Sequence, residues 1–295
     1  TDLQTRFIAG QIPDWSGYEY LQPTLNKLIT HNLLFDFTLP TAYTGAGMEI
    51  TRDKWIVKGV VANMNASKRN ANEKTPVLAY RVDYAKGEFQ GFGFAGVHGK
   101  AHNWAAFDDN GDAAINPISL EAYSTRDTRV DLFEFDAYFI RGDWTVQGQA
   151  SWGRQHKASI TANPDTGELR NAIWSGLSGL VAYKFEPRLE GVIRLDRIFN
   201  SKNGGGLLTY AVADDHNGIG PAQVDADGDL NIDNPNKGVD RTALTLGMNY
   251  AFNLSTVFKV EYRYDWASGP VFLDTKSNTY KKNNQLLSTA VVVSF

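Results

Sequence analysis

The chain has 295 residues, a net charge of −4 at pH 7, 12% aromatic residues and no cysteine. The lack of cysteine excludes disulfides, thiolate metal sites and cysteine nucleophiles, and the mildly acidic balance argues against nucleic acid as a partner. No apolar run approaches the roughly 20 residues of a transmembrane helix. A transmembrane strand has no such run, because apolar and polar residues alternate along it.

Segments with a period of two occur in pairs, and each pair is joined by a short turn. The clearest is VFKVEYRYDW (257–266), in which aromatic or apolar side chains alternate with charged ones from Phe258 to Trp266. A period of two over this length predicts strands and not helices. The predicted hairpins are AYTGAGMEI with KWIVKGVVAN (54–63), VLAYRVDYA (77–85) with FQGFGFAGV, FEFDAYFIRG (133–142) with WTVQGQASW, SGLSGLVAYKF (175–185) with LEGVIRLD, and TALTLGMNYAF (242–252) with 257–266.

The connections between the predicted strands alternate in length. The short turns lie near Arg52, 86–88, Gly142, 186–188 and Asn253, and the long connections are roughly 11–41, 66–75, 101–127, 158–170, 203–239 and 269–282. Membrane barrels place short turns on the periplasmic side and long loops outside. The sequence therefore predicts an all-β fold: one transmembrane antiparallel up-and-down β-barrel domain over 1–295 with about twelve visible strands. Its longest external loop is 203–239, and its last strand ends at Phe295.

The N-terminal third resembles the large outer-membrane porins, in particular the β-barrel porins related to the phosphate-selective family. The resemblance rests on RFIAGQIPDWSGYEYLQP (6–23) and THNLLFDFTLPTAYTGAGM (30–48). The matching residues are Gly10, Gln11, Pro13, Gly17, Tyr18, Glu19, Leu33, Leu34, Phe35, Pro40, Thr44 and Gly45. Several strands precede this motif in that family, whereas here it starts almost at residue 1. Either this barrel is smaller, or N-terminal strands are missing and the complete protein has about sixteen.

The resemblance also implies a role for the long connection 11–41. In such porins this segment folds into the lumen and narrows it. The residues that would line the constriction are Asp14, Glu19, Lys27, His31 and Asp36. The alternative is that the segment caps the rim of the barrel.

Charged residues on the polar faces of the strands are the candidate pore-lining residues. They are Lys58, Arg81, Asp83, Glu134, Asp136, Arg194, Asp196, Lys259, Glu261, Arg263 and Asp265. A strongly selective pore shows a ladder of one sign, whereas here the signs alternate. The pattern predicts ion pairs across the wall and at most weak ion selectivity.

Two acidic motifs in the long loops are candidate calcium sites. Their oxygen-bearing residues are Asp225, Asp227, Asp229, Asn231 and Asp233 in one loop, and Asp108, Asn110 and Asp112 in the other. Carboxylates at alternate positions suit a hard cation. However, Ala113 and Leu230 replace the glycine of an EF-hand, and no glutamate closes either loop. The alternative is a solvated acidic turn.

These observations predict a porin of the bacterial outer membrane that lets small hydrophilic solutes or ions diffuse passively. The expected partners are the lipid bilayer, lipopolysaccharide and two further copies in a homotrimer, with Ca²⁺ in the external loops as the only expected cofactor. No nucleophile elbow of the form G-x-S-x-G is present, so we do not expect an enzyme. The alternative function is a structural scaffold barrel whose calcium-binding loops hold a surface layer or a partner protein.

Overall fold

The computed structural model describes residues 3–40, 42–65, 75–106, 113–123, 127–208, 219 and 234–295. Twelve strands form one antiparallel sheet, in which each strand pairs with its neighbours in the chain until β11, which pairs with β14. The strands are β1 (Gln4–Pro13), β2 (Ala42–Arg52), β3 (Trp55–Asn65), β4 (Val77–Ala85), β5 (Gln90–His102), β6 (Asp127–Arg141), β7 (Trp144–Gln155), β8 (Ala172–Glu186), β9 (Leu189–Phe199), β10 (Arg241–Asn253), β11 (Thr256–Ala267) and β14 (Asn283–Val293). This confirms the predicted all-β antiparallel fold.

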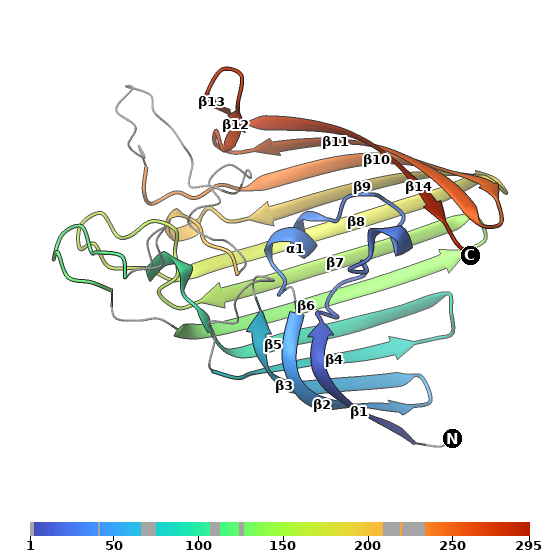
Figure 1. Cartoon of the computed structure of the whole chain (residues 1–295), viewed down its shortest axis with the longest axis horizontal. Coiled ribbons are helices and arrows are strands. Elements are labelled where there is room, and N and C mark those ends of the chain that lie inside the picture. Colours follow the sequence, from blue (N-terminus) through green and yellow to red (C-terminus); the bar gives the residue numbers. More distant parts are fainter. Residues whose placement is uncertain are drawn as a thin grey trace.

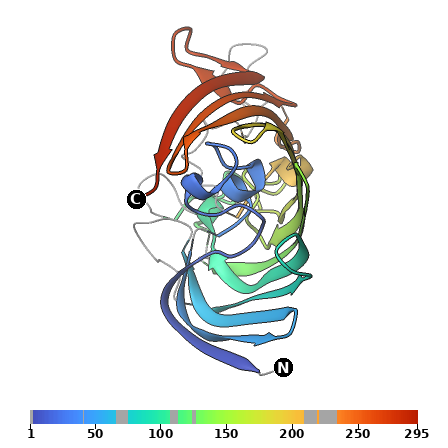
Figure 2. The same cartoon turned by 90° about the vertical axis from the view of Figure 1, so that its right-hand side faces the viewer.

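The sheet is strongly curved and forms a trough-like wall (Figures 1 and 2). The short turns lie at one end of the strands, and the long connections lie at the other. β1 and β14 are the two edges of the sheet, and no pairing joins them within the described residues. The wall therefore has one convex face, one concave face and two free edges.

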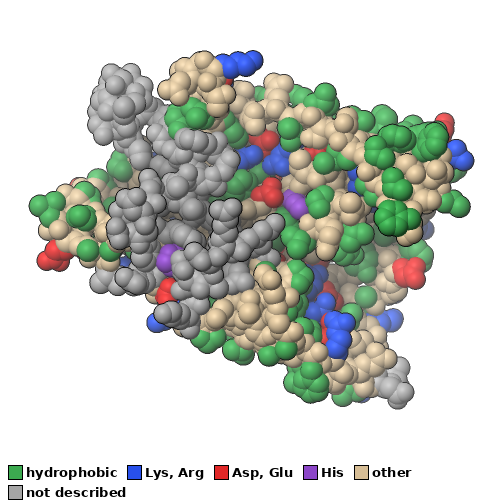
Figure 3. All heavy atoms as spheres, viewed as in Figure 1, with side chains coloured by type: hydrophobic (Ala, Val, Ile, Leu, Met, Phe, Trp, Pro, Cys, Tyr) green, Lys and Arg blue, Asp and Glu red, His purple; other side chains and the backbone are tan. Residues whose placement is uncertain are grey.

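Side chains alternate between these faces with the predicted period. On β11, Phe258 and Tyr262 are 43% and 39% exposed, whereas the intervening Lys259 and Glu261 are buried. Exposed aromatic and aliphatic side chains cover the convex face from β3 to β14. Charged side chains are visible in the hollow of the wall (Figure 3). This inside-out distribution is typical of a barrel whose outer face contacts lipid.

The connection between β1 and β2 is not a plain loop. It contains a short 3₁₀ turn, η1 (Pro23–Leu25), and one turn of α-helix, α1 (Leu33–Phe37). The Asn32 side chain caps α1 by accepting a hydrogen bond from the Phe35 N–H at 2.8 Å, which satisfies one of the free donors at a helix start. The alternating pattern of the sequence predicted none of this local structure, because the connection has no strand period.

Three other short elements lie in the long connections. The 3₁₀ turns η2 (Trp104–Ala106) and η3 (Lys202–Gly204) follow β5 and β9, and a small hairpin of β12 (Phe272–Asp274) and β13 (Thr279–Lys281) precedes β14. The hairpin lies in a segment that the sequence predicted to be irregular. No helix among the described residues is long and apolar enough to cross a membrane.

Candidate functional site

Residues 14–40, called here the inserted segment, lie against the concave face of the wall. The segment runs across the strands, with α1 next to β8 and β9 (Figures 1 and 2). Leu28, Leu33 and Leu34 of the segment are at most 2% exposed. The segment is therefore packed on the wall and does not cap the rim.

Charged side chains of the wall bind the backbone of the inserted segment. Arg194 on β9 donates hydrogen bonds to the carbonyls of Thr30 and His31, both at 2.8 Å, and Arg263 on β11 donates to the same His31 carbonyl at 2.9 Å. Glu261 on β11 accepts hydrogen bonds from the backbone N–H groups of Ile29 and Thr30. These bonds satisfy backbone groups that have no partner in a helix or sheet, which an irregular buried segment requires.

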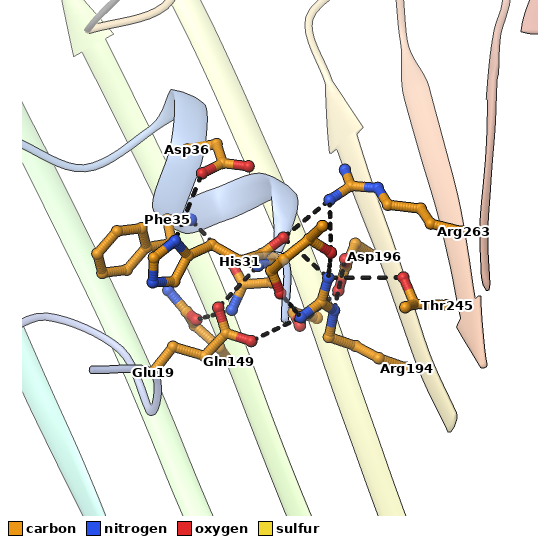
Figure 4. A network of polar contacts seen from close by, with 12 residues as sticks. Glu19, His31, Phe35, Asp36, Gln149, Arg194, Asp196, Thr245 and Arg263 are labelled. Atoms are coloured by element: carbon orange, nitrogen blue, oxygen red, sulfur yellow. Dashed lines mark hydrogen bonds and ion pairs between the residues drawn. The ribbon is translucent and has the colours of Figure 1, made fainter. Parts of the chain in front are cut away.

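A buried ion pair connects the segment to the same part of the wall (Figure 4). The Arg194 guanidinium lies 2.7 Å from the Glu19 carboxylate and 3.0 Å from that of Asp196. The second Glu19 oxygen accepts a hydrogen bond from the Asn32 N–H at 2.7 Å. Burial raises the pKa of Glu19 to about 7, while Arg194 opposes that rise. Glu19 is therefore a group of the segment whose charge changes near neutral pH.

A second contact lies at the start of the segment. Arg81 on β4 forms two hydrogen bonds with the Asp136 carboxylate, at 2.7 and 2.9 Å, and donates to the Trp15 carbonyl at 2.9 Å. Glu134, two residues from Asp136, is only 2% exposed, and neither of its carboxylate oxygens has a hydrogen-bond partner within the described part of the chain.

Two glycines of the wall provide space for leucines of the segment. A β-carbon on Gly176 of β8 would lie 2.8 Å from Leu34 Cγ, and one on Gly247 of β10 would lie 2.3 Å from Leu28 Cδ2. Contacts this short do not occur between carbon atoms, so a larger residue at either position would displace the leucine side chain that packs there. The segment thus fits the wall by shape as well as by charge.

The predicted pore-lining residues all belong to strands of the wall, and most are covered by the segment or paired with one another. Arg81, Glu134, Asp136, Arg194, Asp196, Lys259, Glu261, Arg263 and Asp265 are buried, whereas Lys58 and Asp83 are partly exposed. Arg263 does pair with Asp265 on the same strand at 3.0 Å. Many of their remaining bonds, however, go to the inserted segment, which the alternation in sign did not indicate.

The five predicted constriction residues lie in the segment but differ in their contacts. Asp14 accepts a hydrogen bond from Tyr43 at 2.6 Å, and Lys27 lies 2.5 Å from Glu190 of β9. His31 stacks on Phe35, with 4.0 Å between ring centroids, and its Nδ1 is 4.0 Å from the Asp36 carboxylate. Asp14, Glu19 and Lys27 therefore contact the wall through their side chains.

Sequence reasoning missed two members of this site. Arg241 at the start of β10 is buried and lies 2.8 Å from Asp265. Glu190 binds both Lys27 and the Asn249 amide, the latter at 3.2 Å. Both are charged residues at inward positions of their strands. Arg241 lies just before the predicted segment 242–252, and Glu190 lies within the predicted segment LEGVIRLD but was not named among the pore-lining residues.

All eight predicted calcium ligands, Asp225, Asp227, Asp229, Asn231, Asp233, Asp108, Asn110 and Asp112, lie outside the described residues. Among the residues that are described, no three acidic, histidine or cysteine side chains form a metal-binding group.

Open space remains beside the inserted segment. Two cavities, of about 340 and 270 Å³, flank residues 25–27. Both are lined by Lys27 of the segment and by Lys184 of β8. The segment therefore narrows the hollow of the wall without filling it at this level.

Comparison with known proteins identifies one family and several similar solved structures. A family model described as "Protein of unknown function (DUF3138)" matches residues 2–295. A search of the curated proteins finds no match.

The solved structures that resemble the chain include OmpT, an outer-membrane protein of Vibrio cholerae. The outer-membrane expressed form has a TM-score of 0.54 at 12% identity, covering 97% of this chain and 74% of OmpT. A loop L8 deletion mutant has a TM-score of 0.53 at 14% identity, with 98% and 75% coverage, and a trimer form has 0.53 at 14%, with 97% and 74% coverage. At these identities the likeness shows the fold alone, which is that of an outer-membrane β-barrel. None of these matches supports the narrower resemblance to the phosphate-selective family.

Proposed function

We propose that this chain, which belongs to the DUF3138 family, is a porin-like protein of the bacterial outer membrane through which small hydrophilic solutes or ions diffuse. The sheet provides the wall of the channel, with its apolar convex face in lipid. The inserted segment is the constriction that limits the size of the solutes. The proposal includes no catalysis and no resident cofactor in the channel.

The observation that carries the proposal is the attachment of the inserted segment to the concave face. Two arginines and a glutamate of β9 and β11 form hydrogen bonds with the backbone of the segment. A loop that only covered the rim of the barrel would not reach these side chains. Burying such charges is unfavourable unless each has a partner, so the wall and the segment depend on each other. A segment fixed in this way on the concave face would set the width of the channel.

The test is single-channel conductance in planar bilayers, with the full chain and a variant lacking residues 18–30. Removing these residues deletes Glu19 and Leu28, and with them the cavity wall at residues 25–27. We expect a markedly larger conductance. Unchanged conductance in a variant that inserts normally would exclude the segment as the constriction, and absence of any conductance in the full chain would exclude a channel.

The trimer is a further part of the proposal. One form of OmpT is described as a trimer, and closed rings are the usual symmetry of assemblies of identical chains. The mass of the protein in mild detergent tests this, since a stable monomer contradicts it.

The narrower resemblance to phosphate-selective porins concerns the solute. It rests on the N-terminal motif alone, whereas the alternating signs of the wall charges favour weak selectivity at most. We therefore expect phosphate and chloride to cross the channel with similar permeability. Reversal potentials measured with the two anions test this, and a strong preference for phosphate would contradict it.

A further inference from the structure

Charged residues at outward positions are concentrated in three neighbouring strands, β5, β6 and β7, near the ends that join the long connections. Side chains alternate between the two faces along each strand, and four charged ones fall on the outer face here: Lys100 of β5, Arg129 and Asp131 of β6, and Arg154 of β7. Away from the short turns, the other charged residues at outward positions on the described strands of the wall are Asp127, at the start of β6 beside Lys100, and Arg197 of β9. Asp127 lies 3.8 Å from His102 Nδ1. Three cations and two carboxylates therefore share this surface, and we call Lys100, Arg129 and Arg154 the basic cluster.

Aromatic side chains lie directly below the basic cluster on the same strands. Phe94, Phe133 and Trp152 are exposed on the convex face, at 40%, 37% and 42%. A charged side chain on the outer face of a membrane barrel is costly in the middle of the bilayer and costs little near its surface. We therefore place the basic cluster at the level of the lipid headgroups, on the side of the long connections.

The Asp131 carboxylate connects Arg129 with His98 in this part of the surface. Arg129 Nε donates to Asp131 at 2.9 Å, and His98 Nδ1 lies 2.9 Å from the other oxygen of Asp131. The Tyr80 hydroxyl lies 3.3 Å from His98 Nε2. Arg129 Nη2 also donates to Asp131, at 3.3 Å. The Arg129 side chain nevertheless stays 76% exposed, so its Nη1 side remains open to a ligand.

The cluster has more positive charge than the protein itself balances. Lys100 and Arg129 are direct partners in the pairing of β5 with β6, and Asp131 faces Arg154 across β6 and β7. Like charges directly opposite each other on a sheet are destabilising. Lys100 and Arg154 are exposed, and neither forms an ion pair with an acidic side chain within the described ranges. An anion bound between the three cations would remove this repulsion.

We propose that the basic cluster binds a phosphate group of an outer-leaflet lipid, with lipopolysaccharide as its source. This inference rests on the membrane location proposed above. Arginine and lysine bind phosphate through charge-assisted hydrogen bonds, and a lipid supplies both the phosphate and chains that cover the aromatic side chains below. The site thus fixes the depth of β5 to β7 in the membrane.

The test measures lipid retention after insertion of the full chain into phosphatidylcholine vesicles. Three mixtures are compared: vesicles with lipopolysaccharide, vesicles with the same fraction of phosphatidylglycerol, and plain vesicles with inorganic phosphate in the buffer. We expect lipopolysaccharide to stay bound through detergent extraction and gel filtration. In Lys100→Gln/Arg129→Gln/Arg154→Gln the binding should be about 100-fold weaker, because each cation near an anionic membrane surface contributes roughly fivefold.

The matched control is Arg141→Gln, which removes an exposed cation at the opposite end of β6 and should leave retention unchanged. Equal retention by the triple variant and the full chain overturns the site. Equal retention of phosphatidylglycerol, or displacement of lipopolysaccharide by inorganic phosphate, overturns the assigned source. Protease protection in the vesicles is measured beside retention. A chain that inserts but retains no lipid contradicts this inference, whereas one that does not insert contradicts the proposed function.

Discussion

Arg194 of β9 and Glu19 of the inserted segment form a buried ion pair at 2.7 Å, and their side chains are 0% and 3% exposed. The two residues are 175 positions apart in the chain. The same guanidinium donates to the carbonyls of Thr30 and His31. Arg194 therefore binds the inserted segment at three of its residues, Glu19, Thr30 and His31.

Replacing Arg194 should release the segment. In Arg194→Met the carboxylates of Glu19 and Asp196 lose their shared partner, and breaking a buried ion pair in this way costs about 3–5 kcal/mol. We expect the free energy of unfolding to fall by that amount and the conductance to rise. Arg197→Met is the control, because Arg197 lies three residues further along β9 with its guanidinium 4.8 Å from the Phe199 ring. A conductance equal to that of the unmodified chain would contradict the role of Arg194.

The attachment of the segment should depend on pH through Glu19. Burial raises the pKa of this carboxyl from an ordinary value of 4.5 to about 7, so the attached state binds the proton more tightly than the released state. The contribution to attachment is then complete below about pH 4.5 and is lost as the pH rises through about 7. We expect conductance to increase between pH 5 and pH 8. Glu19→Gln should remove this dependence, and an unchanged pH profile in that variant would assign it to another group.

The glycines opposite the leucines offer a test that changes no charge. A methyl group at Gly176 or Gly247 would overlap Leu34 or Leu28, and overpacking of this kind typically costs 1–3 kcal/mol. Gly176→Ala and Gly247→Ala should therefore raise the conductance. Gly179→Ala is the control, because a β-carbon there meets no atom within 4 Å. If all three variants conduct alike, the shape of the wall does not position the segment.

The two faces of β11 should differ in their tolerance of charge. Tyr262 lies on the convex face and is 39% exposed, and an arginine on the lipid side of a barrel costs about 2–4 kcal/mol near the middle of the bilayer. We expect Tyr262→Arg to lower the free energy of unfolding from vesicles by this amount. Ser288→Arg on β14 is the control, because Ser288 pairs with Glu261 and shares its inward parity. Equal stability losses would contradict the assignment of the faces.

The acidic loop 225–233 remains a proposed calcium site. Three aspartates at alternate positions would give a calcium ion oxygen ligands at about 2.3–2.6 Å, and an ion bound only by the ordered loop would stabilise that order. Chelation should accelerate proteolysis within 203–239 on intact cells while the wall stays folded. The variant Asp227→Ala/Asp229→Ala should be cut as fast without chelator. If the unmodified chain and the variant are cleaved at the same rate, both with and without chelator, the motif is a solvated acidic turn.

The alternation of apolar and polar residues was sufficient to predict the strands of the wall and the two faces of each strand. Along 257–266 each side chain changes face at every step, so the sequence determined which residues point to lipid and which point inward. The five short turns were predicted for the same reason, since polar or flexible residues interrupt the period there. The choice of a membrane barrel over a soluble β-sandwich followed from the alternation of short turns and long connections in the sequence.

The tertiary structure decided where the inserted segment lies and what the inward charges bind. The alternation along the strands places Arg194, Arg263 and Glu261 on the inner face. It does not tell whether an inner side chain contacts water, another wall residue or the inserted segment. The fit of Leu34 to Gly176 joins residues that are distant in the chain. Such contacts depend on the curvature of the whole sheet, which brings β8 to β11 around the segment. The sequence determined the two faces of each strand because that property is local, and only the folded sheet determined their partners.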